Sequence, residues 1–338
     1  MLTGKTSISL GLQGGGAHGA FTWGVLDRLL EHEQWHIDGI SASSAGAMNA
    51  VALAQGLLDG GRAGARAALS RFWMAVADSA PFALLSGSLD NDNLTLAPAF
   101  QAMLQWSRYL SPEELNPFDH NPLRDIIAEQ FDFERLRRNG RVKLFVAATH
   151  ANTGKLRIFN NSDLSADAVM ASACLPTIYR PVEIDGEPYW DGGFAANPAV
   201  FPLFYDCRAD DIMLVLLSPL SFQTTPQSAE EIKNRVLELA FNSTFLREMR
   251  MFTHLRRMLG QRWPILGRFE RHLMRTRFHM IEAPEKLAQL HPATRMAANA
   301  DFFATLRDLG RAAAETWLAA HGAAVGRRST APLDDLFY

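Results

Sequence analysis

The sequence has few of the features of a secreted or membrane-spanning protein. Its 338 residues include only two cysteines, Cys174 and Cys207, which make neither a disulfide framework nor a zinc site, so a reducing compartment is expected. The amino-terminal residues lack the long apolar stretch and cleavage site of a signal peptide. No run approaches the roughly 20 apolar residues of a spanning helix. We therefore expect a cytoplasmic protein whose membrane contact, where it occurs, is peripheral.

The sequence also has little net charge. A formal net charge of -3 excludes a strongly basic nucleic-acid binder as the default class. With 48% hydrophobic and 20% charged residues, the composition is that of an ordinary globular chain. There are no internal repeats and no cluster of metal-ligating residue types, and we expect neither a metal nor a cofactor.

Short apolar runs alternate with helical patterns at the start of the chain. Residues 7–12 and 37–43 have the pattern of short strands, and each run is followed by residues at helical spacing. Strand, helix, strand and helix in succession are typical of parallel β-α-β winding. Further strands are predicted at 142–149, 156–159, 212–217 and 278–281, and further helices at 62–78, 166–174 and 302–320. The prediction is one α/β domain with a helical C-terminal portion packed on it.

A glycine-rich loop stands between the first strand and the first helix. It has the sequence Gly14-Gly15-Gly16-Ala17-His18-Gly19. Unpaired backbone N–H groups at such a helix start favour negative charge, either a phosphate or the oxyanion of acyl transfer. The loop also fits a dinucleotide motif, but that use requires an acidic residue at the end of the second strand. The only acid of that strand, Asp38, stands at its start, and a purely structural glycine turn is a further alternative.

Ser44 lies in the turn from the second strand into the next helix. A serine in a tight strand-to-helix turn between small residues is typical of a nucleophile elbow. Its usual pattern is Gly-x-Ser-x-Gly, and this chain has Gly46 on one side but Ala42 on the other. The alternative interpretation is that Ser44 only caps the helix.

A serine nucleophile needs a base, and two kinds of base are available in the sequence. Five histidines lie late enough for a Ser-His-Asp enzyme, namely His254, His272, His279, His291 and His321. None has the expected surroundings. Asp191 is followed by Gly192 and Gly193 among turn residues, where a carboxylate can serve as a general base if its pKa suits the reaction.

The three motifs together resemble the patatin-like phospholipase family in residue type, order and spacing. The residues that carry the resemblance are those of segment 14–19, Ser44 to Ala50 and Asp191 to Gly193, with support from Ala171 to Pro176. It covers roughly residues 7 to 204. The family implies a three-layer α/β/α fold with a mostly parallel central sheet, and a Ser-Asp dyad that cleaves acyl esters of glycerolipids without a metal.

The resemblance assigns a role to each motif residue. Ser44 would attack the ester carbonyl, and Asp191 would take its proton and later activate the deacylating water. The backbone amides of an oxyanion hole would come from Gly14, Gly15, Gly16, Ala17 and Ala45. Supporting positions are His18, Gly19, Gly46, Gly192 and Gly193. The family often has Arg or Lys at the position of His18.

The expected organisation is a patatin-like catalytic core at 7–204 and a strand with helices at 205–338. The second part contains a basic amphipathic segment, 228–277. Between Arg247 and Arg277 there are nine arginines and two acids, Glu248 and Glu270, with interleaved apolar residues. Such a segment is typical of helices that lie on anionic bilayers. Alternatively, these helices cover the core with their arginines in solvent.

The sequence therefore predicts a serine esterase of the phospholipase A or lysophospholipase type that acts on phospholipid or related acyl esters. Three alternatives stay open. They are a Ser-His-Asp esterase with other substrates, a nucleotide-binding oxidoreductase, and a non-catalytic lipid-binding protein.

Overall fold

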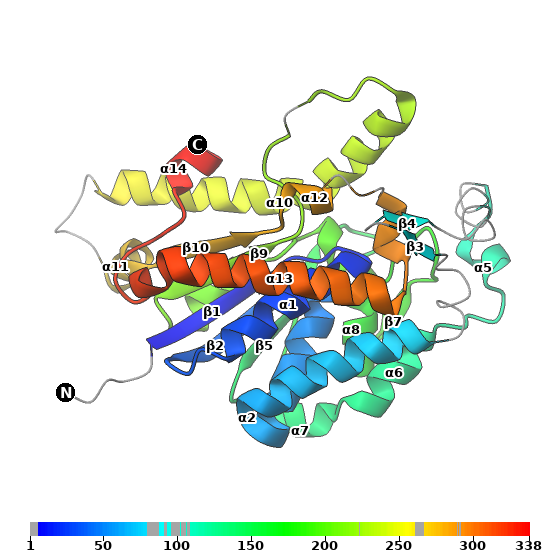
Figure 1. Cartoon of the computed structure of the whole chain (residues 1–338), viewed down its shortest axis with the longest axis horizontal. Coiled ribbons are helices and arrows are strands. Elements are labelled where there is room, and N and C mark those ends of the chain that lie inside the picture. Colours follow the sequence, from blue (N-terminus) through cyan, green and yellow to red (C-terminus); the bar gives the residue numbers. More distant parts are fainter. Residues whose placement is uncertain are drawn as a thin grey trace.

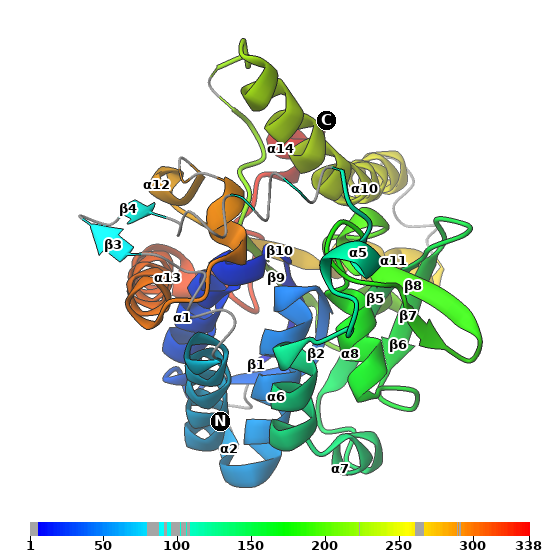
Figure 2. The same ribbon diagram turned by 90° about the vertical axis from the view of Figure 1, so that its right-hand side faces the viewer.

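The structure is a computed structural model in which a central sheet lies between two layers of helices (Figures 1 and 2). It describes residues 6–79, 88–90, 93–95, 102, 106, 109–222, 224–260, 267–288, 290 and 292–338. The described strands are β1 (Thr6–Leu12), β2 (Trp35–Ser43), β3 (Ser88–Asp90), β4 (Asn93–Thr95), β5 (Lys143–His150), β6 (Leu156–Asn160), β7 (Val182–Ile184), β8 (Glu187–Asp191), β9 (Asp211–Leu216) and β10 (Arg277–Glu282).

The central sheet is mostly parallel, as the alternation of strands and helices predicts. Its order is β10-β9-β1-β2-β5-β8-β7, with β6 also paired to β5. The pairs from β10 to β5 are parallel, whereas β6, β7 and β8 pair antiparallel. The strands predicted at 7–12, 37–43, 142–149, 156–159, 212–217 and 278–281 are confirmed as β1, β2, β5, β6, β9 and β10.

Helices and short 3₁₀ turns connect the strands. They are η1 (Gly16–His18), α1 (Gly19–Leu30), α2 (Ala45–Asp78), α5 (Pro112–Leu115), α6 (Pro122–Gln130), α7 (Phe133–Arg138), α8 (Ala166–Ser172), η2 (Gly192–Phe194), α9 (Phe201–Tyr205), α10 (Ala229–Gly260), α11 (Arg268–Arg275), α12 (Glu285–Ala288), η3 (Pro292–Met296), α13 (Ala300–His321), η4 (Gly322–Ala324) and α14 (Leu333–Phe337). The predicted helix at 62–78 is the second part of α2, which bends at Gly60 and Gly61. Among the described helices, none is long and apolar enough to cross a membrane.

Both faces of the sheet are covered, and β9 shows this most directly. Met213 and Val215 belong to the hydrophobic cluster formed with α1, α2 and α13, while Ile212 and Leu214 belong to the cluster formed with α9, α10 and α11. Alternate residues of a strand point to opposite faces. A continuous apolar strand that is buried on both faces is typical of parallel sheets in three-layer folds.

One feature of the sheet is missing from the sequence-based prediction. The segment around Asp185 is predicted only as a turn, but it is the tight connection of a β7–β8 hairpin, with Asp185 and Gly186 at positive φ. The hairpin matters because β8 ends at Asp191. The loop predicted from Ser79 to Asn93 lies largely outside the described residues.

Helices α1 and α13 approach each other through two glycines. A Cβ atom at Gly310 would lie 2.0 Å from the carbonyl oxygen of Phe21. A Cβ atom at Gly24 would likewise fall within contact of the Arg307 backbone. These clashes involve backbone atoms, so only glycine permits this approach.

We predict that Gly310→Ala lowers the free energy of unfolding by at least about 1 kcal/mol, because overpacking outweighs alanine's higher helix propensity. Denaturant titration followed by circular dichroism measures the change. Gly140→Ala is the control, since a Cβ there meets nothing within 4 Å, and its effect is expected within about 0.5 kcal/mol. Equal stabilities of the two variants would contradict the close-packing explanation.

Candidate active site

Strand pairing brings the two catalytic candidates together. Ser43, the last residue of β2, pairs with Ala147 of β5, and the next residue of β5, Ala148, pairs with Asp191 of β8. Ser44 and Asp191 are therefore brought side by side across the end of β5, although they are far apart in sequence. This is the carboxyl edge of the parallel strands, where ligands bind in open α/β sheets.

Ser44 has a strained backbone and is held by the buried residues around it. Its φ of 54° and ψ of -127° lie outside the regions that a non-glycine residue normally adopts. The N–H of Ser44 donates to Ser172 Oγ at 2.9 Å, and Ser43 Oγ donates to the Ala196 carbonyl at 2.5 Å. Ser41 and Ser43 are buried, whereas Ser44 is partly exposed. The geometry is that of a nucleophile elbow.

Asp191 is almost completely buried and lies next to Ser44 across β5. The Gly193 N–H donates to Asp191 Oδ1 at 2.7 Å. Burial raises the pKa of Asp191 from 3.8 to about 7, although the Gly193 N–H and the Ser44 side chain act in the opposite direction. The Asp191 carbonyl accepts from Thr149 Oγ1 at 2.8 Å. The carboxyl group can therefore accept a proton near neutral pH.

The glycine loop follows β1 and lies against Asn197. The Gly14 N–H donates to Asn197 Oδ1 at 2.7 Å, and Asn197 Nδ2 donates to the Gly14 carbonyl at 3.4 Å. The N–H groups of Gly15 and Gly16 have no hydrogen-bond partner in the part of the chain that the structure describes. Both residues are at least partly exposed. The loop thus keeps free donors beside the elbow, while Gly14 is already engaged.

His18 does not place a positive charge at the loop. Its side chain is buried, Nε2 lies 2.8 Å from Thr294 Oγ1, and its ring packs edge-on against Phe302. Burial, helped by the nearby charge of Arg295, lowers the pKa of His18 to about 3. The histidine is neutral at physiological pH. The Arg295 backbone lies against Gly16, and the Arg295 guanidinium pairs with Glu238 at 3.3 Å.

The remaining motif residues sit where a larger side chain would not fit. Ala17 and Ala45 are buried at the starts of the two helices. At Gly19 an added Cβ would lie 2.7 Å from Ala45 Cβ, and at Gly46 it would lie 2.5 Å from the Leu12 carbonyl oxygen. At Gly192 it would lie 2.1 Å from the Ala147 carbonyl oxygen, and at Gly193 it would lie 2.4 Å from the Phe241 ring. Small residues therefore let the elbow, the glycine loop and the aspartate turn meet.

The motifs assign no role to three residues that hold these elements in place. Asn197 fixes Gly14, and Ser172 accepts from the Ser44 N–H. Gln13 joins the loop to the backbone that follows β9, because its Oε1 accepts from the N–H groups of Leu217 and Ser218. Of the three, Ser172 lies in the stretch from Ala171 to Pro176 that supports the resemblance.

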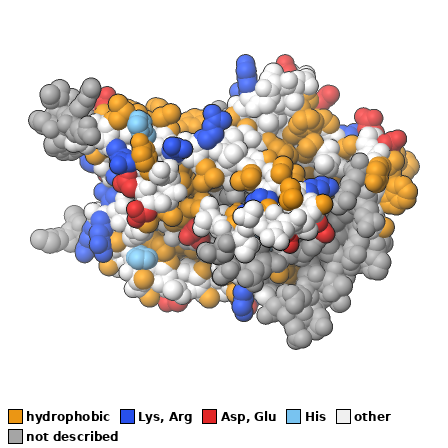
Figure 3. All heavy atoms as spheres, turned by 90° about the horizontal axis from the view of Figure 1, so that it is seen from above, with side chains coloured by type: hydrophobic (Ala, Val, Ile, Leu, Met, Phe, Trp, Pro, Cys, Tyr) orange, Lys and Arg blue, Asp and Glu red, His pale blue; other side chains and the backbone are white. Residues whose placement is uncertain are grey.

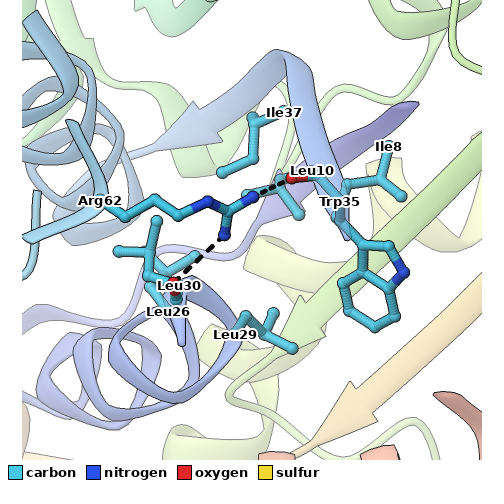
Figure 4. A pocket seen from close by; sticks show the side chains of 8 residues that line it. All are labelled: Ile8, Leu10, Leu26, Leu29, Leu30, Trp35, Ile37 and Arg62. Atoms are coloured by element: carbon cyan, nitrogen blue, oxygen red, sulfur yellow. Dashed lines mark hydrogen bonds between the residues drawn. The ribbon is translucent and has the colours of Figure 1, made fainter. Parts of the chain in front are cut away.

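His279 and a small apolar cavity lie away from this site, and His291 lies outside the described residues. His279 Nε2 bonds Oδ1 of Asp211, the first residue of β9, at 2.9 Å, at the opposite edge of the sheet. A small apolar cavity between α1, β1 and β2 is lined by Trp35 and closed by Arg62, which donates to backbone carbonyls (Figure 4). Its volume of about 10 Å³ holds no ligand. Among the described residues, no group of three or more His, Cys, Asp or Glu could hold a metal.

The burial of Asp191 predicts a pH-dependent cost in stability. The carboxyl group ionises above pH 3.8 in the unfolded chain but only above about pH 7 in the folded one. This group therefore favours folding at low pH, and that contribution to the free energy of unfolding is lost as the pH rises between the two values. The advantage of Asp191→Asn over the wild type should grow by up to about 1.4 kcal/mol per pH unit in this window and level off above it. Denaturant titrations at several pH values measure it.

As a control, Asp308→Asn removes an exposed carboxylate that pairs with Arg307, and its stability difference from the wild type should change little over the same window. A difference for Asp191→Asn that is constant with pH would show that the carboxyl group has an ordinary pKa.

The family model for patatin-like phospholipases matches residues 10–204. No curated protein matches the sequence. Of solved structures, VipD from Legionella pneumophila is similar with a TM-score of 0.42 and 15% identity over 93% of this chain and 67% of that one. The ExoU-SpcU complex of Pseudomonas aeruginosa has a TM-score of 0.30 and 14% identity over 95% and 77%. On the family match, which covers more than half of its length, the chain belongs to the patatin-like phospholipases, a family of lipid hydrolases.

Proposed function

We propose that the chain is a lipid acyl hydrolase of the phospholipase A or lysophospholipase type that uses Ser44 as nucleophile and Asp191 as general base. The observation that carries the proposal is the position of Ser44, in a partly exposed strand-to-helix turn next to the buried Asp191 carboxyl group, whose pKa is raised to about 7. A base whose pKa lies near the working pH transfers protons most effectively.

In the acylation step, Ser44 Oγ attacks the carbonyl carbon of the ester while its proton passes to Asp191. The tetrahedral intermediate collapses, the C–O bond to the alcohol breaks, and Asp191 returns the proton to the leaving alcohol. The products of this step are an acyl-Ser44 ester and a deacylated lipid. In the second step Asp191 removes a proton from water, which attacks the acyl-enzyme and releases the fatty acid and free Ser44.

The oxyanion of both steps would be stabilised by backbone amides. Gly15 and Gly16 support this role because their N–H groups have no partner among the described residues and stand at the start of a helix, where the partial positive charge favours an anion. Ala17 and Ala45 are further donors at the two helix starts. The Gly14 N–H already binds Asn197, so Gly14 contributes mainly by shaping the loop.

The alternatives from the sequence have less support. A Ser-His-Asp esterase would place a histidine between serine and acid, but Ser44 lies next to Asp191 across β5, and His18, at the neighbouring loop, is neutral and bonded to Thr294. A nucleotide-binding oxidoreductase would require an acid at the end of β2, which instead ends in the serine elbow. The boundary between a core at 7–204 and a portion at 205–338 remains a proposal, as does the cytoplasmic location.

We expect a fluorophosphonate probe to label the wild type at Ser44, with no labelling of Ser44→Ala. Turnover of a short-chain ester or a phospholipid should fall by at least about 10⁴-fold in Ser44→Ala and about 10³-fold in Asp191→Asn. Mass spectrometry of the adduct and titration of released fatty acid provide the measurements.

Ser41→Ala is the matched control. Ser41 lies on β2, the strand that leads into Ser44, and its buried hydroxyl has no hydrogen-bond partner in the described structure. The variant should keep both labelling and turnover. Labelling of another residue, or full turnover by Asp191→Asn, would rule out the Ser44–Asp191 mechanism.

The pH dependence of turnover should report the same carboxyl group. The base must be ionised, so kcat/KM for a water-soluble ester should rise with pH and reach a plateau, with an apparent pKa near the value of about 7. Stopped assays between pH 5 and 9 measure the profile. A profile that is flat down to pH 5 would exclude Asp191 as the base.

A further inference from the structure

The first half of α10, residues 229–241, projects from the body of the molecule. Figures 1 and 2 both show it rising above the sheet and its covering helices before the helix continues along the body. It starts with a capping box in which the Glu231 N–H donates to Ser228 Oγ and the Glu231 carboxylate accepts from the Ser228 N–H. This half is therefore a regular helix with a defined start, but its outer side has no covering element in the described structure.

The side chains of this half are arranged in the opposite sense to a normal surface helix. Four large apolar residues are between 47% and 58% exposed, namely Ile232, Val236, Leu237 and Leu239. Ile232, Val236 and Leu239 follow the spacing i, i+4, i+7 and form one stripe. A helix on a globular protein normally turns such a stripe towards the core.

Two charged residues of the same half, Arg235 and Glu238, face the protein instead, whereas Glu231 and Lys233 are exposed. The Arg235 guanidinium stacks over the Phe222 ring, and Glu238 pairs with Arg295 of η3 at 3.3 Å. At the base of this half, Asn242 accepts from Gln13 Nε2 at 2.8 Å. The inward face is thus fixed by specific polar contacts, and a simple rotation that buried the apolar stripe would break them.

The second half of α10 has the ordinary arrangement. Phe245, Met249 and Phe252 are buried in the cluster with β9 and α9, and Arg247 and Arg250 are exposed. This supports the interpretation that the basic segment covers the core. Arg277 begins β10 and α11 directly precedes it, so the end of the Arg247–Arg277 segment lies at the amino edge of the sheet, away from Ser44.

The base of the projecting half, from which the apolar stripe extends, lies beside the candidate catalytic residues. Phe241, at the base of the projecting half, packs against Phe194 with ring centroids 4.5 Å apart, and its ring fills the space over Gly193 next to Asp191. A protein partner or a second copy seated on the stripe would stand in front of the site that the substrate must enter. A lipid surface in the same place would deliver the substrate.

We propose that the first half of α10 inserts its apolar stripe into the surface of the lipid aggregate that holds the substrate. The inference rests on the proposed lipid hydrolysis and identifies which face of the molecule meets the lipid. Hydrophobic side chains on the face seen in Figure 3 gather in patches with Lys and Arg between them. On this half, Lys233 and Arg235 are balanced by Glu230, Glu231 and Glu238. Binding should therefore depend on apolar insertion and only weakly on salt or anionic lipid.

The test uses the full chain with Ser44→Ala, so that lipid is bound but not cleaved. Binding to phosphatidylcholine vesicles is measured by co-sedimentation at 0.1 and 0.5 M NaCl. The triple change Ile232→Ser, Val236→Ser and Leu239→Ser should weaken binding at least about tenfold. The matched control changes three exposed apolar residues of the second half, Met251→Ser, Leu255→Ser and Met258→Ser, and should leave binding within about twofold.

Two further measurements separate this proposal from the proposed function. With Ser44 intact, the first triple variant should hydrolyse a water-soluble ester at the wild-type rate and lose activity only on vesicles. If the protein has no esterase activity but still binds vesicles through the stripe, that result would contradict the proposed hydrolase function and leave the lipid-insertion proposal in place. The lipid proposal is overturned if the first triple variant binds vesicles as the wild type does, if the control variant loses binding instead, or if light scattering shows a dimer that only the first triple variant dissociates.

Discussion

The carboxyl group of Asp191 is removed from water next to a hydroxyl group, and the rest of the site is arranged around this constraint. The Gly193 N–H and the Ser44 side chain favour its charged form, but they do not compensate for burial. The carboxyl group stays in place because Asp191 is part of the sheet, paired with Ala148 and bonded through its carbonyl to Thr149. The folding free energy of the sheet thus holds a carboxyl group in a position where its charge is costly, which is common at active sites.

The opposite edge of the same sheet provides a comparison. Asp211, the first residue of β9, is also buried, and burial alone would raise its pKa. Hydrogen bonds from His279 and Arg277 outweigh that effect and hold the pKa of Asp211 at about 2. Asp211 is therefore held in its charged form by these partners and anchors the C-terminal strands, whereas Asp191 has no cationic partner among the described residues. The difference in partners, and not burial itself, separates the lowered pKa of Asp211 from the raised pKa of Asp191.

Local sequence patterns predicted most of the sheet, and the motifs predicted both residues of the contact at its carboxyl edge. Strands β1, β2, β5, β9 and β10 follow from apolar runs because buried parallel strands leave such a signal. Strand β6, which pairs antiparallel with β5, is predicted from a shorter run. The β7–β8 hairpin did not follow, since its residues are half exposed and polar and leave no such signal. The contacts of Asn197 with Gly14 and of Ser172 with Ser44 join residues 183 and 128 positions apart. They depend on the tertiary fold, and no local periodicity contains them.

The glycine loop depends on parts of the chain that the family model does not match. That match ends at residue 204, yet Gln13 accepts from the backbone of Leu217 and Ser218 and donates to Asn242. On the other side of the loop, η3 supplies Thr294 to His18 and the Arg295 backbone against Gly16. A helix start binds an anion well only if its free amides are held in position before the anion forms. The matched region contains Ser44 and Asp191, and the C-terminal helices and turns hold the glycine loop beside them.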